Sequence, residues 1–320
     1  MHSFWNKLPR PFFVLAPMEA VTDVVFRHVV RRAGAPDVFF TEFANATGWV
    51  HAGDRAIRGR LVKTSDEHPL VAQIWGGEPG DMEAFAKHCA ELGFDGIDIN
   101  MGCPAKSAVK SGGSALIRKP DVAVAAIAAA KTAGLPVSVK TRLGYTHVDE
   151  WQKWLAVLFA QDLAALTIHL RTKKEMSKVP AHYELISEIK KLRDERAPQT
   201  LLIINGDIRD RQHGMELVDK YKIDGVMIGR GVFANPFVFN DQKPAQPNSE
   251  RRKDLLELLR YHLDLFDQYQ PELGRPFETL KRFFKIYIRD FDGASDLREQ
   301  LMHAATTDEV RELLQRTTET

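Results

Sequence analysis

Short apolar runs recur along the first 240 residues at intervals of a few tens of residues, with stretches of helical periodicity between them. Eight such runs occur, at residues 12–17, 38–43, 70–75, 96–100, 136–140, 165–169, 201–205 and 225–228. Strands that are apolar along their whole length are buried on both faces, which is typical of parallel sheets covered by helices. Eight strand-helix units also match the usual size of a (β/α)8 barrel, about 250 residues. The sequence therefore predicts an α/β chain built as a (β/α)8 TIM barrel.

A doubly wound open sheet is the alternative arrangement of the same elements. That arrangement would gather polar residues at one switch point, whereas here polar residues follow every apolar run. The pattern therefore favours the barrel. The clearest intervening helices are predicted over 80–92, 121–133, 181–196 and 210–221. Gly93 and Gly134 are expected to end the first two helices, because glycine commonly occupies the position after a helix.

The sequence changes character after Phe239. Residues 240–250 are polar and contain proline, and no apolar strand follows them. Apolar residues then recur at helical spacing, in four groups: Leu255, Leu256, Leu259, Leu263 and Phe266; Leu280, Phe283, Phe284 and Tyr287; Leu297 and Leu301; Val310, Leu313 and Leu314. We therefore expect a catalytic barrel over residues 1–240 and a small helical bundle domain over 241–320.

Charge and cysteine content restrict the possible partners and compartment. The 44 Lys and Arg residues nearly balance the 43 Asp and Glu residues, so any contact with nucleic acid requires a local basic patch. Two cysteines are too few for a disulfide framework and fit a reducing compartment. No apolar stretch approaches the roughly 20 residues that span a bilayer, and residues 1–10 lack the apolar core of a signal peptide. We expect a cytoplasmic protein that binds neither a membrane nor a metal ion.

The residues that end the eight apolar runs are unusually polar. In a TIM barrel the functional side chains lie at the carboxyl ends of the strands. Here these ends carry, in chain order, Pro17-Met18-Glu19, Thr41-Glu42, Gln73, Asn100 to Pro104, Lys140 and Arg142, His169 and Arg171, Asn205-Gly206-Asp207, and Gly229-Arg230-Gly231. Burying this many polar groups costs free energy unless they pair with one another or with a ligand. A large polar ligand in the barrel mouth is the simplest explanation.

The last two strand ends predict a phosphate site. Asn205-Gly206-Asp207 and Gly229-Arg230-Gly231 combine small residues, whose backbone N–H groups a ligand can approach closely, with one permanent cation. The loops after strands seven and eight are where barrels usually hold a phosphate. Lys140 and His169, which lie on neighbouring strands, could place positive charge beside a ring that gains electrons.

Cys103 is the candidate catalytic residue. It follows the fourth apolar run, precedes Pro104 and lies in a long loop that contains Gly102, Gly112 and Gly113. A free thiol has a pKa of about 8.5, so it stays largely protonated at neutral pH and can donate a proton. Cys89 instead lies on the apolar face of a predicted helix, where a cysteine is usually a small buried hydrophobe.

Several of these segments together resemble the flavin-dependent tRNA-dihydrouridine synthases. The matching segments are Leu15-Ala16-Pro17-Met18, Gln73, Asp98 to Lys106, Gly113 to Leu116, Lys140 to Gly144, Thr167-Ile168-His169, Asn205-Gly206-Asp207 and Ile228-Gly229-Arg230. They occur in order between residues 12 and 236, and Asn100-Met101-Gly102-Cys103-Pro104 is the most specific of them. The resemblance implies an FMN-containing barrel and a helical tRNA-binding domain. It also implies reduction of the C5–C6 bond of uridine in tRNA, with NADPH as electron donor.

The resemblance further implies a role for each matching residue. Cys103 would donate a proton to uracil C5 while the flavin delivers hydride to C6. The residues expected to hold FMN are Pro17, Met18, Glu19, Gln73, Lys140, His169, Asn205, Gly206, Asp207, Gly229 and Arg230. Asn100, Arg142 and Arg171 are expected at the target base. The chain departs from the family at Leu170, where members often have glycine, so the contact made by the adjacent Arg171 is left open.

Local basic patches are the predicted tRNA contacts. Lys281, Arg282 and Lys285 lie in the segment 279–289, where residues 282, 285 and 289 would share one helical face, and Lys106 lies close to Cys103.

We expect the protein to act as a monomer. Two other functions fit the same sequence: a flavin-dependent reductase of a free pyrimidine or other small molecule, and an RNA-binding module without enzymatic activity.

Overall fold

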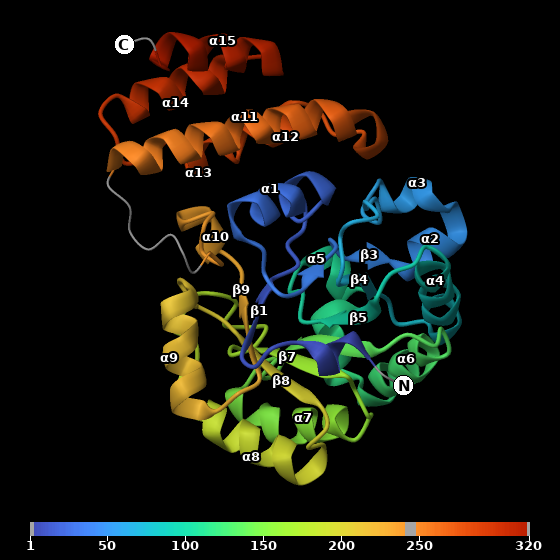
Figure 1. The fold of residues 1–320 in the computed structure, drawn as a ribbon. Helices are drawn as coiled ribbons and strands as arrows, with labels where there is room; N and C mark the ends of the chain where they lie inside the picture. Colours follow the sequence, from blue (N-terminus) through green and yellow to red (C-terminus); the bar gives the residue numbers. More distant parts are fainter. Residues whose placement is uncertain (1–2, 241–247, 319–320) are drawn as a thin grey trace.

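The computed structural model describes residues 3–240 and 248–318 of the chain. Parallel strands alternate with helices and form one sheet (Figure 1). The strands are β1 Phe12–Leu15, β2 Phe39–Phe40, β3 Ala44–Asn45, β4 Leu70–Trp75, β5 Gly96–Met101, β6 Val137–Arg142, β7 Ala165–His169, β8 Leu201–Asn205 and β9 Gly225–Ile228.

The sheet closes on itself as a barrel. Its hydrogen-bonded order is β1-β9-β8-β7-β6-β5-β4-β2, with every pair parallel. Between its two ends, Val14 and Val38 form a parallel bridge, and the N–H of Asp37 donates to the carbonyl of Phe13 at 2.8 Å. An open doubly wound sheet has no such bridge between its edge strands. The predicted (β/α)8 barrel is therefore confirmed, and the open-sheet alternative is wrong.

The second predicted strand is divided in two. Residues 38–43 were expected to form one run, but β2 ends at Phe40 and β3 begins at Ala44, and both pair with β4. The division is stabilised by Thr41, whose side-chain oxygen accepts a hydrogen bond from the backbone N–H of Gln73 at 3.0 Å. Glu42, the next residue, is fully buried. The break thus places a carboxyl group inside the protein at the rim of the barrel.

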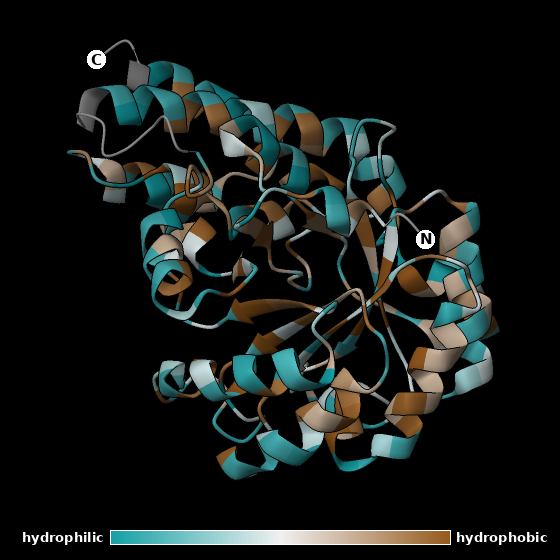
Figure 2. Ribbon diagram, turned by 60° about the horizontal axis from the view of Figure 1, so that its bottom comes forward, coloured by the Kyte–Doolittle hydropathy of each residue, from teal (hydrophilic) through white to brown (hydrophobic). Residues whose placement is uncertain are grey.

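Helices follow the strands, and the longer ones cover the outer face of the barrel. They include α1 Val24–Gly34, α2 Ala46–Ala52, α3 Asp54–Ile57, α4 Pro79–Glu91, α5 Lys106–Val109, α6 Pro120–Lys131, α7 Trp151–Phe159, α8 Ile186–Arg196, α9 Arg211–Tyr221 and α10 Gly231–Ala234. Three of the four predicted helices are confirmed to within two residues, and the third begins later than expected, at Ile186. Gly93 and Gly134 adopt the left-handed φ values of 72° and 74° that end the helices before them. Figure 2 shows the apolar residues concentrated on the strands and the polar residues on the outward helix faces.

The amino-terminal residues close the barrel end opposite the mouth. Trp5, in the 3₁₀ helix Phe4–Lys7, packs against Phe12 and Phe40 with ring centroids 5.9 and 6.4 Å apart. Phe12 begins β1, and the neighbouring Phe4 lies against Gly96, which begins β5. In the described part of the chain, aromatic side chains thus fill the amino ends of these strands, which leaves the carboxyl ends as the side that a ligand can approach.

The carboxyl-terminal helices form a separate layer against α1 and α10 (Figure 1). They are α11 Asn248–Leu273, α12 Glu278–Lys281, α13 Phe284–Tyr287, α14 Ala294–His303 and α15 Thr307–Thr318. The predicted apolar stripes are buried, except that Leu313 is only partly covered. Residues 241–247 of the expected linker lie outside the described residues, and residues 248–250 already belong to α11.

This helical layer packs on the barrel through aromatic side chains. Phe26 of α1 stacks on Phe283, with ring centroids 5.1 Å apart, and lies 6.3 Å from the ring of His262 of α11. Within the layer, His262 is hydrogen-bonded to the hydroxyl of Tyr287 at 2.7 Å. Among the described residues, none of the helices combines the length and apolar character that crossing a bilayer requires.

Candidate active site at the carboxyl ends of the strands

The register of the sheet brings the predicted side chains to one mouth. Asn100 of β5 is paired with Lys140 of β6, Arg142 with His169 of β7, and His169 with Asn205 of β8. Neighbouring strands in a sheet lie about 4.8 Å apart, so these side chains form a continuous arc. The polar strand ends predicted from the sequence are therefore adjacent in space.

A buried network beneath this arc fixes its first members. The carboxylate of Asp98 accepts hydrogen bonds from Gln73 Nε2 at 2.7 Å and from Ser138 Oγ at 2.6 Å. The amide oxygen of the same Gln73 side chain accepts a hydrogen bond from Asn100 Nδ2 at 3.1 Å. Burial raises the pKa of Asp98 to about 6, although these hydrogen bonds partly offset the effect. Gln73, which was expected to contact a cofactor ring, is here fully buried and bonded to protein groups.

Asp98 and Ser138 are parts of the site for which the sequence predicted no role. A signal was present, because Gly96, Asp98 and Asn100 alternate with Ile97, Ile99 and Met101 along the strand. Alternate residues of a strand face the same side. The small and polar set therefore faces the barrel interior, and a carboxylate there requires donors on the neighbouring strands.

The backbone around Cys103 is held on two sides. Asn100 Oδ1 accepts hydrogen bonds from the N–H groups of Gly102 at 3.1 Å and Cys103 at 2.9 Å. Arg142 Nε donates to the carbonyl of Gly102 at 2.8 Å. The Cys103 side chain is half-buried, and burial raises the pKa of its thiol above the ordinary value. The thiol is therefore a protonated group at neutral pH, in a fixed position on the rim.

Cys103 also lines a cavity of about 460 Å³. Its walls include Trp75, Phe43 and Asn45, together with Ala105 and Ala108 on the side of α5. Two flat aromatic side chains beside a thiol suit a planar ring of the size of a nucleobase. Lys106 lies exposed on α5, next to this wall.

Glu19 lies in the same cavity rather than free in the mouth. Its carboxylate forms an ion pair with Arg60, which also donates to the carbonyl of Ile57 at 2.9 Å. Nothing in the sequence indicates this pairing, because the two residues are 41 positions apart. Pro17 and Met18 are half-buried beside Glu19, and the N–H of Met18 donates to Thr22 Oγ1 at 3.0 Å.

Lys140 and His169 are two titratable side chains of the arc whose pKa values are shifted. Lys140 Nζ donates to Asn205 Oδ1 at 3.3 Å, and burial, reinforced by Arg142, lowers the pKa of this lysine to about 8. Burial and the surrounding cations hold the pKa of His169 well below its ordinary value, so its imidazole is neutral at pH 7. Arg171 lies 3.2 Å from His169 Nε2, and since a guanidinium can only donate, that nitrogen is the acceptor and the proton is on Nδ1.

Arg142 and Arg171 are both buried and both use their donors on protein groups. Arg142 bonds to the carbonyls of Thr172 at 3.2 Å and Met176 at 3.1 Å as well as to that of Gly102. Arg171 donates to the carbonyl of Val179 at 2.6 Å and forms an ion pair with Asp207. These contacts make both arginines structural supports of the rim, and their predicted contact with a base stays a prediction.

The loops after β8 and β9 fit a phosphate. Gly206 and Asp207 adopt left-handed φ values of 122° and 52°. A Cβ on Gly231 would lie 2.4 Å from the carbonyl oxygen of Arg209, so only glycine is accommodated there. Arg230 bonds to Asp207 at 3.2 Å, yet its side chain remains 66% exposed. Among the described residues, the guanidinium of Arg230 thus keeps donors unused beside glycine-containing bends, as an anion site requires.

The basic segment of the helical layer differs from the prediction. Residues 279–289 form two short helices, α12 and α13, with a turn at Arg282 and Phe283 between them, instead of one continuous face. Lys281 donates to the carbonyl of Met302 at 2.9 Å, and Arg282 donates to the carbonyls of Thr279 at 2.9 Å and Ala20 at 3.1 Å. Lys285 is exposed. Lys281 and Arg282 thus use donors on backbone carbonyls, whereas Lys285 and Arg289 line one groove, and the contact of these cations with tRNA stays a prediction.

Within residues 3–240 and 248–318, no group of three or more His, Cys, Asp or Glu side chains is arranged to hold a metal ion.

The model of the dihydrouridine synthase (Dus) family matches residues 14–320. The chain is 60% identical over 314 residues to the "Probable tRNA-dihydrouridine synthase 2" of Bacillus subtilis (strain 168), covering 98% of this chain and 95% of that protein. It is 58% identical to the "Probable tRNA-dihydrouridine synthase" of Staphylococcus aureus (strain N315), covering 98% and 94%.

Among solved structures, a complex of 2-naphthoyl-CoA reductase superposes with a TM-score of 0.53 at 9% identity. The match covers 72% of this chain and 49% of that one, and it concerns the fold alone.

Proposed function

Because the chain belongs to the dihydrouridine synthase family, we propose that it reduces the C5–C6 bond of uridines in tRNA to 5,6-dihydrouridine. The observation that carries this proposal is the position of Cys103. Its thiol is protonated at neutral pH, its backbone is held by Asn100 and Arg142, and it opens on a cavity with two aromatic walls.

We propose FMN as the cofactor and NADPH as its electron donor. When bound, the reduced flavin supplies the hydride that uracil C6 receives. The glycine-lined bends at Asn205-Gly206-Asp207 and Gly229-Arg230 would hold its phosphate and ribityl chain. Pro17 and Met18 would line the ring, while Glu19 lies on the cavity side of the same loop. Gln73 would act mainly through the network that orients Asn100.

The proton for uracil C5 comes from the Cys103 thiol. In each turnover the S–H bond breaks as the C5–H bond forms, and the resulting thiolate then takes a proton from water. A raised thiol pKa favours this last step, since the thiolate is the less stable form in its half-buried position. Asn100 and Arg142 keep the sulfur on the rim, so that the proton moves over a short, fixed path.

Lys140 and His169 have different tasks in this proposal. Lys140 is mainly protonated at pH 7 and would stabilise negative charge on the reduced ring system. His169 is neutral, with a hydrogen on Nδ1, and would act as a hydrogen-bond donor without adding charge. Asn205 holds Lys140 in place by accepting from its ammonium group.

The helical layer, residues 241–320, is proposed to bind tRNA, while residues 1–240 form the catalytic barrel. Lys106 and Lys285 are exposed and suited to phosphate contacts. For Lys281 and Arg282 we propose a supporting role, since both donate to backbone carbonyls.

We propose further that the protein acts in the cytoplasm and that it is a monomer. Light scattering after gel filtration would test the oligomeric state.

The test compares Cys103→Ala with Cys89→Ala. Cys89 is a matched control because it is fully buried in α4, where burial raises the pKa of its thiol to about 12. We expect Cys103→Ala to retain flavin but to form dihydrouridine about 10²- to 10⁴-fold more slowly, the usual cost of losing a general acid. Cys89→Ala should retain near-normal turnover.

Dihydrouridine is measured by mass spectrometry of nucleosides from a tRNA transcript incubated with flavin-loaded protein and NADPH. Normal turnover of Cys103→Ala would remove the thiol from the mechanism. Reduction of free uridine at the rate seen with tRNA would instead favour a small-molecule reductase.

A further inference from the structure

Two arginines in and directly after α3, here called the α3 segment (residues 54–60), take no part in the ion pairs around them. Arg55 lies in α3 and Arg58 directly follows it, and both are exposed. Within residues 3–240 and 248–318, neither side chain makes a hydrogen bond, an ion pair or a contact with an aromatic ring. Arg60, two residues farther on, is by contrast bonded to Glu19 and to the carbonyl of Ile57. Arg55 and Arg58 therefore keep all their donors for an external acceptor.

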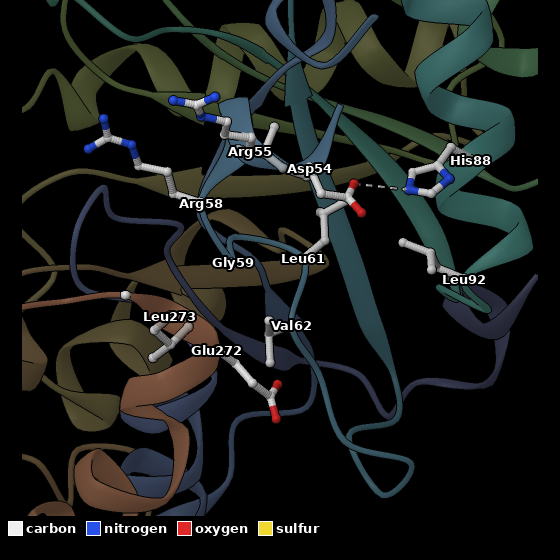
Figure 3. A pocket seen from close by; sticks show the side chains of 12 residues that line it. Asp54, Arg55, Arg58, Gly59, Leu61, Val62, His88, Leu92, Glu272 and Leu273 are labelled. Carbon is white, nitrogen blue, oxygen red and sulfur yellow. Dashed lines mark ion pairs between the residues drawn. The ribbon is translucent and has the colours of Figure 1, made fainter. Parts of the chain in front are cut away.

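The nearby acidic groups do not neutralise these arginines. Asp54 accepts a hydrogen bond from Trp49 Nε1 at 3.0 Å and faces His88 Nε2 at 3.7 Å. Figure 3 shows Arg55 and Arg58 extending to the same side, away from the Asp54–His88 pair and away from Glu272. The two guanidinium groups thus form a small, uncompensated positive surface.

This surface borders a groove between the barrel and the helical layer. The groove has a volume of about 610 Å³ and is lined by Arg55, Arg58 and Gly59 on the barrel side and by residues 272–274 of the helical layer (Figure 3). A Cβ on Gly59 would lie 3.2 Å from Leu273 Cα, so glycine lets the two segments meet closely. The end of α11 therefore braces the backbone that carries the arginines.

The groove and the cavity of Cys103 are neighbours. Ile57 lines both of them, and Ala56 and Arg60, on either side of Arg58, line the cavity as well. A nucleotide chain whose base enters the Cys103 cavity past this shared wall would leave its adjoining phosphates close to the α3 segment. Arginine is well suited to such phosphates, because its planar donors can bind two oxygens at once.

We propose that Arg55 and Arg58 bind phosphates of the tRNA backbone next to the target uridine. This inference rests on the proposed function and adds to it a path for the RNA, across α3 and along the groove to the helical layer. It also changes the expected tRNA surface, because Lys281 and Arg282 are engaged with backbone carbonyls whereas Arg55 and Arg58 are not.

The test measures binding of an unmodified tRNA transcript to the flavin-loaded full-length protein over a range of salt concentrations. The variant is Arg55→Gln with Arg58→Gln, which removes two positive charges. The matched control is Arg196→Glu, which changes the charge by the same amount at an exposed position at the end of α8. In Figure 1, α8 and α3 lie on opposite sides of the barrel.

We expect the double variant to raise the Kd for the transcript on the order of tenfold. The slope of log Kd against log salt should fall by about 1.5, since each phosphate contact contributes roughly 0.7 to 0.9. NADPH oxidation without tRNA should be unchanged, because neither arginine lines the Cys103 cavity. Arg196→Glu should leave both the Kd and the slope at the wild-type values.

An unchanged Kd and slope in the double variant would overturn the inference, as would an equal loss in Arg196→Glu. Binding of the transcript and formation of dihydrouridine are measured separately in the same wild-type sample, so that the inference and the proposed function are tested independently. Wild-type protein that binds the transcript without reducing it would count against the proposed reaction, while the effect of the two arginines would still be measured.

Discussion

Lys140 carries a positive charge that is lost just above neutral pH. Its ammonium group is surrounded by Asn205, Arg142 and the buried Asp98, and its pKa is lowered to about 8 because burial outweighs the attraction of Asp98. The cation is therefore present below about pH 8 and is lost as the pH rises through that value. A step that depends on this charge must slow over the same range.

We predict that dihydrouridine formation falls as the pH rises through about 8, since neutral Lys140 no longer stabilises negative charge in the mouth. Lys140→Arg should move the decline to higher pH because a guanidinium stays charged. The remaining decline would reflect the Cys103 thiol, whose pKa is raised above its ordinary value. Single-turnover rates between pH 6 and 10 check this. Identical profiles for the two proteins would assign the wild-type decline to another group.

At the scale of elements, the short 3₁₀ helix Phe4–Lys7 acts as the seal of the barrel. Trp5 is almost completely buried against Phe12 and Phe40, and its Nε1 has no hydrogen-bond partner among the described residues. The side chain is therefore retained for its apolar volume rather than for its polar atom.

We predict that Trp5→Ala lowers the free energy of unfolding by about 3–5 kcal/mol, because it leaves a cavity at the amino ends of the strands. Trp5→Phe should cost less, since it keeps much of the ring and removes an unsatisfied N–H. Urea denaturation of the two variants gives the comparison. A loss for Trp5→Phe as large as that for Trp5→Ala would show that ring volume is not what stabilises this end of the barrel.

At the scale of the whole molecule, one arginine joins the helical layer to the barrel. Arg275, in the loop between α11 and α12, forms ion pairs with Asp23 at 2.8 Å and with the fully buried Glu42. Burial raises the pKa of Glu42 to about 7 despite this pairing, and Glu42 Oε1 accepts no hydrogen bond among the described residues. The junction therefore contains a carboxylate that is costly to ionise.

The pH dependence follows from this shift. A carboxyl with a raised pKa binds a proton more tightly in the folded state than in the unfolded state, so it favours folding at low pH. That advantage is lost as the pH rises from about 4.5 to about 7. We predict that the stability of Glu42→Gln relative to wild type increases over this window and is constant above it. Denaturation at several pH values measures the difference, and a constant difference would contradict the raised pKa.

The sequence alone was sufficient to predict the barrel, because continuous apolar strands alternating with helices have few compact arrangements. It also predicted most of the mouth, since residues that end neighbouring parallel strands must lie side by side, as Asn100, Lys140, His169 and Asn205 do. The family resemblance added a chemical role for Cys103. These predictions depended on local pattern and strand order.

Pairings between distant residues were decided only by the tertiary structure. Asp98 with Ser138, Glu19 with Arg60 and Glu42 with Arg275 join residues 40, 41 and 233 positions apart. The same holds for two cations of the helical layer, because Lys281 bonds to the carbonyl of Met302 and Arg282 to that of Ala20. Charge in a sequence shows that a group can bind an anion, but whether its donors remain unused depends on which carbonyls and carboxylates the fold brings within reach.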